Sequence, residues 1–203
     1  MKSDTIAAIA TALSDAGIGI IRISGPEAIA VANRVVVNKK KEHTLKNWQT
    51  HTIHYGFVEE NGTILDEVMV SVMKAPRSYT TEDTVEINCH GGVLLTKRVL
   101  EAVLHAGARM AEPGEFTKRA FLSGRIDLSE AEAVMDLIHS KNEFAMKASV
   151  NQLKGSVSAK VRSLREDILY EIAFIESALD DPEHISLEGY PDKLMAKTRG
   201  LSQ

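Results

Sequence analysis

Hydrophobic and polar residues alternate along several stretches of the first half of the chain, and this period of two is typical of half-buried β-strands. The pair Asn61-Gly62 separates two of these stretches, and this dipeptide favours a two-residue hairpin turn. We therefore expect the strands on either side of it to form a hairpin. The alternation predicts strands over residues 17–25, 50–59, 63–75 and 84–89.

Other stretches of the first half carry apolar residues every three or four positions, which is the period of an α-helix. Residues 27–36 show this pattern directly after Pro26, a residue favoured in the first turn of a helix. Residues 93–107 show it again after a Gly-Gly pair. Short strands mixed with helices predict an α+β fold class, and we place this domain at residues 1–118.

From about Phe116 onward almost every segment has helical spacing, interrupted at Gly124 and Gly155. We therefore predict part of an all-α helical domain over residues 119–203. Within it, one set of apolar residues steps by three or four positions, as in a helix that packs along a single seam. These seam residues are Val157, Val161, Leu164, Ile168, Ile172, Ile175 and Leu179.

The helical region begins with a helix-capping signal, and its last helix-like segment is unfinished. A capping box is present in two registers, Asp127 with Glu130 and Ser129 with Glu132, and either one predicts a helix N-terminus. Residues 191–203 begin another helix-like segment at the end of the sequence. Because the seam has no partner in the pattern and the last helix is unfinished, we expect the chain to be part of a longer protein.

Composition and charge narrow the function without choosing one. The 203 residues are 44% apolar and 26% charged, which is ordinary for a soluble globular chain. The net charge of −4 gives no general attraction to nucleic acid, so RNA binding would need a local basic surface or a partner. The single cysteine excludes an internal disulfide. No apolar run is long enough to span a membrane, and the N-terminus lacks the apolar core of a signal peptide. We expect a cytoplasmic protein without membrane association.

Two of the predicted strands carry opposite charges. Arg22 lies on the less apolar face of the strand 17–25, and Glu86 lies on the less apolar face of the strand 84–89. If both strands belong to one sheet, the two side chains can project from the same side. The spacing fits a cross-strand surface ion pair, which is worth little, at least as well as a ligand-binding pair.

His90-Gly91-Gly92 stands between a predicted strand and a predicted helix. Glycines at such a point allow close backbone approach, and a helix N-terminus offers unpaired N–H groups to an anion. The run is also similar to the oxyanion loop of esterases, but the sequence contains no Gly-x-Ser-x-Gly. A tight strand-to-helix turn is an equally good interpretation.

Common sequence motifs for metal binding and nucleotide binding are absent from the sequence. The seven histidines form no His-Glu-x-x-His motif and there is no cysteine pair, so we predict no metal site. There is no Gly-x-x-x-x-Gly-Lys-Ser/Thr, so this chain has no nucleotide P-loop of its own. Cys89 falls on the apolar face of its strand and is expected to be a small buried hydrophobe.

Three cations, Lys118, Arg119 and Arg125, lie close to the predicted domain boundary. Arg125 follows a glycine and precedes a helix start, which is an unusual place for a charge that only aids solubility. Arg125 can face an anionic ligand or pair with Asp127, and the spacing does not decide between these roles.

Four stretches together resemble one family. They are "GIGIIRISG", "APRSYTTEDTVEINCHGG", "EPGEFTKRAFLSGRIDLSEAEAVMDLI" and "NQLKG". They are similar to the N-terminal and early helical parts of the MnmE (TrmE) family of tRNA-modification GTPases. The resemblance spans nearly the whole chain, and the block from Pro-Gly-Glu-Phe to Asp-Leu is highly specific.

The resemblance implies a fold, a ligand and an assembly for the N-terminal domain. In the family this domain resembles the tetrahydrofolate-binding fold of aminomethyltransferases, forms a homodimer, and binds a 5-formyl-tetrahydrofolate-type one-carbon donor at or near the dimer interface. Matched by motif, the cofactor-binding positions are Arg22, Glu86 and Arg125. A carboxylate can accept two adjacent N–H donors of a pterin ring, so Glu86 is the candidate for that role. The arginines would pair with glutamyl carboxylates or polar ring atoms of the folate.

The resemblance also implies the activity of the whole protein. With its flavin-dependent partner MnmG, it would hydrolyse GTP using Mg²⁺ and K⁺ and add an aminomethyl-type group (carboxymethylaminomethyl) to C5 of the wobble uridine of certain tRNAs. The family's GTPase domain and cysteine-bearing C-terminal helices lie beyond residue 203, so we expect no catalytic residue in this chain. The alternatives are a self-sufficient folate-dependent one-carbon transferase and a dimerisation scaffold with a degenerate folate site.

Overall fold

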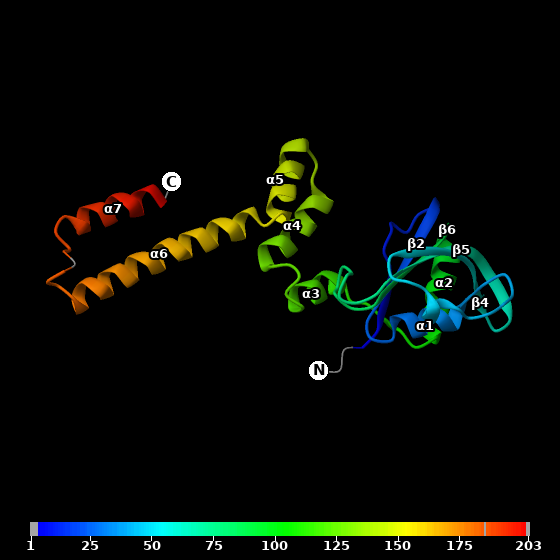
Figure 1. Cartoon of the computed structure of the whole chain (residues 1–203). Coiled ribbons are helices and arrows are strands. Elements are labelled where there is room, and N and C mark those ends of the chain that lie inside the picture. The colour runs from blue at the N-terminus through cyan, green and yellow to red at the C-terminus, as the bar shows by residue number, and fades with distance from the viewer. Residues whose placement is uncertain (1–3, 185, 202–203) are drawn as a thin grey trace. The chain divides into compact units, whose positions relative to one another are not determined.

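The computed structural model describes residues 4–184 and 186–201, and the chain divides into two compact units after Ile126 (Figure 1). They are called here the N-terminal unit and the helical unit. The boundary predicted after residue 118 falls inside a helix, α3 (Glu115–Leu122). In the structure α3 belongs to the same unit as the sheet.

A single mixed sheet forms the centre of the N-terminal unit, with the strand order β3-β4-β5-β6-β2-β1-β7 in the described residues. Neighbouring strands pair antiparallel, except β1 and β7, which are parallel. β2, β4, β5 and β6 confirm the four predicted strands, whereas the short β1, β3 and β7 were not predicted. The strands are β1 (Ile6–Ile9), β2 (Ala16–Ser24), β3 (Val36–Val37), β4 (Thr52–Glu60), β5 (Thr63–Met73), β6 (Thr84–Gly91) and β7 (Arg109–Met110).

Asn61 and Gly62 form the turn between β4 and β5, as predicted. Their φ angles are 51° and 80°, so both residues are in the left-handed region that a type I′ hairpin turn requires. Glycine adopts this conformation without a steric cost, and asparagine is one of the few other residues that visits it routinely. The turn sets the register of the hairpin, in which Glu60 is opposite Thr63.

Two helices, α1 (Ala28–Val35) and α2 (Val93–His105), pack against one face of the sheet (Figure 1). The apolar members of the alternating strands turn toward these helices, and Ile21, Ile23 and Ile87 are fully buried. This burial confirms the predicted division of β2 and β6 into an apolar and a polar face. The opposite face of the sheet, which α1 and α2 leave uncovered, is called the open face.

A thiol and a loop residue complete this core. Cys89 on β6 is buried, as predicted, and its Sγ donates to the carbonyl oxygen of Gly19 at 3.3 Å. Burial raises the pKa of this thiol above its ordinary value. In the long polar loop before β4, the 3₁₀ helix η1 (Leu45–Asn47) inserts Leu45 into the core.

In the described residues the helical unit has four helices: α4 (Leu128–His139), α5 (Glu143–Leu153), α6 (Ser156–Asp180) and α7 (Tyr190–Leu201). Of the two predicted capping boxes the first is formed. Asp127 accepts a hydrogen bond from the N–H of Glu130 at 2.9 Å, and the Glu130 side chain accepts one from the N–H of Asp127 at 2.8 Å. The break between α4 and α5 was not predicted, and there Asn142 caps α5 by accepting from the N–H of Ala145.

The predicted apolar seam lies along α6, but most of it faces water. Val161 and Leu179 are 59% and 68% exposed. In the described part of the helical unit, the buried residues are only Ala133, Ser149 and Ala178. None of the described helices is both long and apolar enough to cross a bilayer.

Candidate functional site

Arg22 and Glu86 stand directly opposite each other on the open face, where β2 and β6 pair antiparallel. Arg22 Nε donates to Glu86 Oε1 at 2.7 Å, and the two side chains are 31% and 21% exposed. The prediction that they project from the same side of one sheet is confirmed. Ser71 on β5 is the other cross-strand neighbour of Glu86, so the pair lies within the sheet and not at its edge.

Two aromatic rings flank the Arg22 guanidinium. Its central carbon, Cζ, is 5.8 Å from the ring centroid of Tyr79 and 5.7 Å from that of Phe116. Both distances allow cation–π attraction. Tyr79 comes from the loop between β5 and β6, and Phe116 comes from the first turn of α3. The ion pair therefore has aromatic surfaces beside it.

Arg125 reaches the same tyrosine from the segment after α3. Its Nη1 donates to the carbonyl oxygen of Tyr79 at 3.0 Å, and its Cζ is 5.0 Å from the ring centroid. The Tyr79 hydroxyl lies 3.0 Å from the hydroxyl of Thr117, which ties the ring to α3. Asp127, the alternative partner of Arg125, serves as the N-cap of α4. Arg22 and Arg125 thus meet at Tyr79, and Glu86 joins them through Arg22.

Hydrogen bonds on either side of Tyr79 anchor the β5–β6 loop. Ahead of it, the Ser78 hydroxyl donates to the carbonyl oxygen of Glu82 at 2.6 Å. Behind it, Thr80 is buried, with its hydroxyl 2.6 Å from that of Ser24 on β2. Because both neighbours are anchored, the ring needs little ordering when a ligand arrives, which reduces the entropic cost of binding.

A network of charges joins the start of the chain to α3. Glu115 is 8% exposed and accepts from Arg109 at 2.8 Å and from Arg119 at 3.0 Å. Arg119 also pairs with Asp4 at 2.7 Å and with Glu82 at 3.1 Å. The Arg109 guanidinium holds the pKa of both Asp4 and Glu115 down to about 2. Arg119, one of the three cations near the predicted boundary, is therefore engaged by carboxylates of the fold.

The His90-Gly91-Gly92 run is less of a turn than predicted, because β6 continues through Gly91 and only Gly92 acts as the N-cap of α2. A Cβ atom on Gly91 would lie 2.4 Å from the carbonyl oxygen of Ala16, so only glycine allows β2 to approach. His90 is exposed, and its Nδ1 lies 2.8 Å from Asp66 Oδ1. The predicted close backbone approach is confirmed, and its partner is β2.

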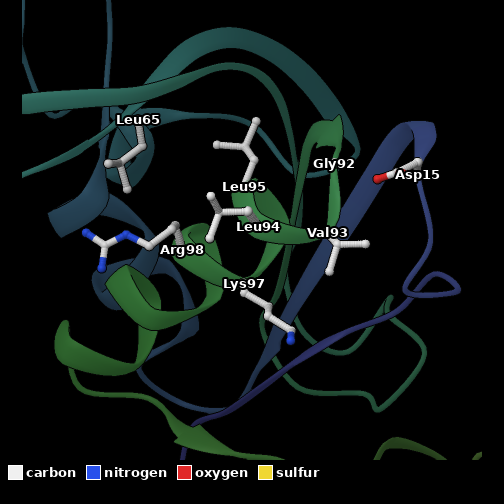
Figure 2. A pocket seen from close by; sticks show the side chains of 8 residues that line it. All are labelled: Asp15, Leu65, Gly92, Val93, Leu94, Leu95, Lys97 and Arg98. Atoms are coloured by element: carbon white, nitrogen blue, oxygen red, sulfur yellow. The ribbon is translucent and has the colours of Figure 1, made fainter.

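An open hollow lies beside the start of α2 (Figure 2). Leu94 and Lys97 face it from α2, Leu65 comes from β5, and Asp15 stands across from them. Leu94 is 76% exposed, and the lining is mainly apolar, so the hollow has few groups that could orient a polar ligand. In the described part of the chain, no three His, Cys, Asp or Glu side chains are grouped to hold a metal ion.

Tyr79 and Phe116 are site neighbours that sequence reasoning missed. Each is a lone aromatic residue in a polar segment, "RSYTTED" and "PGEFTK", and an aromatic in such a segment is the signal that was available. The charge network gave no local signal. Asp4 and Arg109 lie far apart in the sequence, and only the parallel pairing of β1 with β7 brings them together.

The two units correspond to two family descriptions. Residues 5–125 match "GTP-binding protein TrmE N-terminus", and residues 128–202 match "MnmE helical domain". The fold and these matches define the chain as a TrmE-type N-terminal domain followed by a helical domain. The chain belongs to the MnmE (TrmE) family.

Curated relatives carry the name "tRNA modification GTPase MnmE". The relative from Lachnoclostridium phytofermentans is 62% identical over 194 residues, which are 96% of this chain and 42% of the relative. Relatives from Listeria welshimeri and Bacillus subtilis are 51% and 50% identical over 201 and 196 residues, covering 99% and 96% of this chain. These matches cover 43% and 42% of the two relatives, so the chain spans less than half of their length.

Proposed function

We propose that this chain is the folate-binding and dimerisation part of a tRNA modification GTPase, and that a 5-formyl-tetrahydrofolate-type donor binds at Arg22, Glu86 and Arg125. The observation that carries the proposal is the pairing of Arg22 with Glu86 at 2.7 Å beside two aromatic rings. A folate needs both an orienting charge and flat apolar surfaces. The N-terminal unit would then be a form of the tetrahydrofolate-binding fold of aminomethyltransferases.

Glu86 is proposed to orient the pterin ring. Arg22 engages one carboxylate oxygen, Oε1, whereas a carboxylate has roughly four acceptor positions on its two oxygens. Glu86 therefore retains the capacity to accept two adjacent N–H donors of the pterin in parallel. Arg22 fixes the carboxylate in position, and the rings of Tyr79 and Phe116 supply apolar surface for the aromatic parts of the folate.

A homodimer is proposed because the open face exposes large apolar side chains. Ile18 and Ile53 are 62% and 63% exposed, and Tyr55 and Met69 are 40% and 45% exposed. Tyr55 and Met69 are cross-strand partners, so part of this apolar surface is continuous. Contiguous exposed apolar surface marks an interaction site, and a second copy covering it would bring the folate site close to the interface.

The whole protein is proposed to act in the cytoplasm with MnmG on the wobble uridine of certain tRNAs, hydrolysing GTP with Mg²⁺ and K⁺. The names of the relatives support the tRNA modification and the GTP hydrolysis in this proposal. Because the sequence contains no Gly-x-x-x-x-Gly-Lys-Ser/Thr, we assign GTP hydrolysis to a part of the protein that this chain does not include. The chain alone is expected neither to hydrolyse GTP nor to modify tRNA.

Calorimetric titration of the chain with 5-formyl-tetrahydrofolate tests the folate site. We expect saturable binding by a dimer, with the dimer verified by solution mass, and loss of binding in Glu86→Gln. The matched control is Glu101→Gln, which removes an exposed carboxylate on α2 that pairs with Arg98. Absence of binding by the folded wild-type dimer, or unchanged binding by Glu86→Gln, would overturn the assignment.

The same preparation separates the two alternatives. A self-sufficient one-carbon transferase would consume the folate without a partner protein, and a scaffold with a degenerate site would dimerise without binding folate. The paired carboxylate and guanidinium on the open face favour a site that binds folate over a degenerate one.

A further inference from the structure

A second, basic hollow borders the proposed folate site. It has a volume of about 530 Å³ and lies between the β5–β6 loop and the segment after α3. Its lining includes Arg77, Tyr79, Arg125 and the hydroxyl residues Ser78 and Ser123. This volume is within the range of pockets that hold small-molecule groups.

The lining of this hollow is positively charged. Among the described residues that line it there is no aspartate or glutamate. In the described part of the chain the Arg77 guanidinium has no hydrogen-bond or ion-pair partner, and the Arg125 guanidinium interacts with the carbonyl oxygen and ring of Tyr79 and with no carboxylate. Asp83, a nearby acid, is engaged by the N–H of Ala75 at 2.9 Å. Two arginine charges without a carboxylate partner favour an anion.

Tyr79 connects this hollow to the Arg22–Glu86 pair. The Cζ atoms of Arg22 and Arg125 lie 5.8 Å and 5.0 Å from the centroid of the same ring. A ligand that starts at Glu86 and crosses Tyr79 therefore arrives at Arg125 and enters the hollow that Arg125 and Arg77 both line. A folate has this order of groups, because its pterin is followed by an aromatic benzoyl ring and then by glutamyl carboxylates.

We propose that the hollow binds the glutamyl end of the folate, with Arg125 on the first glutamyl carboxylate and Arg77 on the γ-linked glutamates beyond it. The inference rests on the proposed folate site and adds that the ligand class is the polyglutamylated folates. It also assigns a direction to the ligand, with the pterin at Glu86 and the tail at Arg77. Arg77 is then a specificity residue that discriminates between tail lengths and does not contact the pterin.

The test compares the monoglutamate and triglutamate forms of 5-formyl-tetrahydrofolate by calorimetry at low ionic strength. Each exposed ion pair contributes up to about 1 kcal/mol, so we expect the triglutamate to bind about fivefold more tightly. Arg77→Gln is expected to bring the ratio of the monoglutamate Kd to the triglutamate Kd close to one. It is expected to change the monoglutamate Kd itself by less than about twofold. Arg77→Lys should retain a ratio above one, because it keeps the charge.

Lys97→Gln is the matched control, since it removes one exposed positive charge from α2 at the other hollow (Figure 2). It is expected to leave the ratio unchanged. If wild type binds both forms equally, or if Lys97→Gln lowers the ratio as much as Arg77→Gln, the tail site is overturned while the folate site stands. If neither form binds to wild type, the proposed folate site itself fails.

Discussion

The two units of this chain use the same kinds of apolar residues to very different extents. In the N-terminal unit Ile21, Ile23 and Ile87 are fully buried between the sheet and its two helices. In the helical unit Ile168 and Ile172, on the seam of α6, are 49% and 46% exposed. A periodic apolar pattern therefore specifies an element and the face it will bury, but burial depends on a second surface being present.

Charged groups show the same contrast. In the N-terminal unit Glu115 pairs with Arg119, and the two side chains are only 10% and 12% exposed, so water screens this ion pair little. In the helical unit Glu171 links α6 to α7 by accepting from Lys197 at 2.8 Å and from the Tyr190 hydroxyl. The Lys197 side chain is 40% exposed, so water screens this ion pair more strongly. Removal of a charge should therefore affect the two units unequally.

The largest effect is expected from a cavity in the core. Ile87→Ala should lower the free energy of unfolding of the N-terminal unit by about 4 kcal/mol, because the side chain is fully buried and the space left behind is not refilled. The measurement is urea denaturation followed by the fluorescence of Trp48, the one tryptophan of the chain, which stacks on His54. A loss below about 1 kcal/mol would show that the core collapses around the cavity.

Glu115→Gln should destabilise the same unit by about 2 kcal/mol, because it removes a nearly buried carboxylate that accepts from Arg109 and Arg119, while both guanidinium groups keep Asp4 as a partner. The low pKa of Glu115, about 2 against an ordinary 4.5, fixes the pH dependence. The stabilisation that ionised Glu115 provides is fully present above pH 4.5 and is lost as the pH falls through about 2. The difference in free energy of unfolding between wild type and variant should therefore shrink over this pH range. Glu143→Gln in the helical unit, whose side chain is 85% exposed, is the matched control and should have almost no effect.

A smaller effect is expected at the start of the helical unit. Asp127→Ala removes the N-cap of α4 and should cost about 1 kcal/mol, seen as a lower midpoint of the thermal transition in far-ultraviolet circular dichroism. Asp136→Ala, in the middle of α4 and exposed, is the control and should not lower it. Equal losses in both variants would contradict the role of Asp127 as a cap.

The smallest effect is expected on the seam. Ile172→Ala, the counterpart of Ile87→Ala, should change the free energy of unfolding by less than about 0.5 kcal/mol, because the side chain is already half exposed. The measurement is urea denaturation followed by circular dichroism at two protein concentrations. A loss above about 1 kcal/mol that depends on concentration would show that a second copy covers the seam.

Sequence patterns predicted the parts of this fold that depend on local order. Strands of eight residues or more and the Asn61-Gly62 turn were found, because alternation and turn chemistry are written in neighbouring residues. The two-residue strands β3 and β7 were missed, since so short a segment has no period and exists only through its partner.

The candidate site shows the same limit. A period of two placed Arg22 and Glu86 on the polar faces of their strands, but their direct opposition depends on the register between β2 and β6. The meeting of Arg125 with Tyr79 depends on how the chain returns after α3, over a separation that no local pattern records. The ligand roles of Arg22, Glu86 and Arg125 remain predictions that the titrations above test.

The burial of Cys89 gives the protein a reporter of strand opening. As the one cysteine of the chain, it has a raised thiol pKa and a hydrogen bond to Gly19, so a thiol-labelling reagent reacts with it only when the core around β6 opens. Glu86 lies on the same strand. The labelling rate therefore measures the local opening equilibrium of the strand that carries the proposed site. Folate that binds only the closed form should slow labelling by a factor of one plus the ratio of the free folate concentration to its Kd.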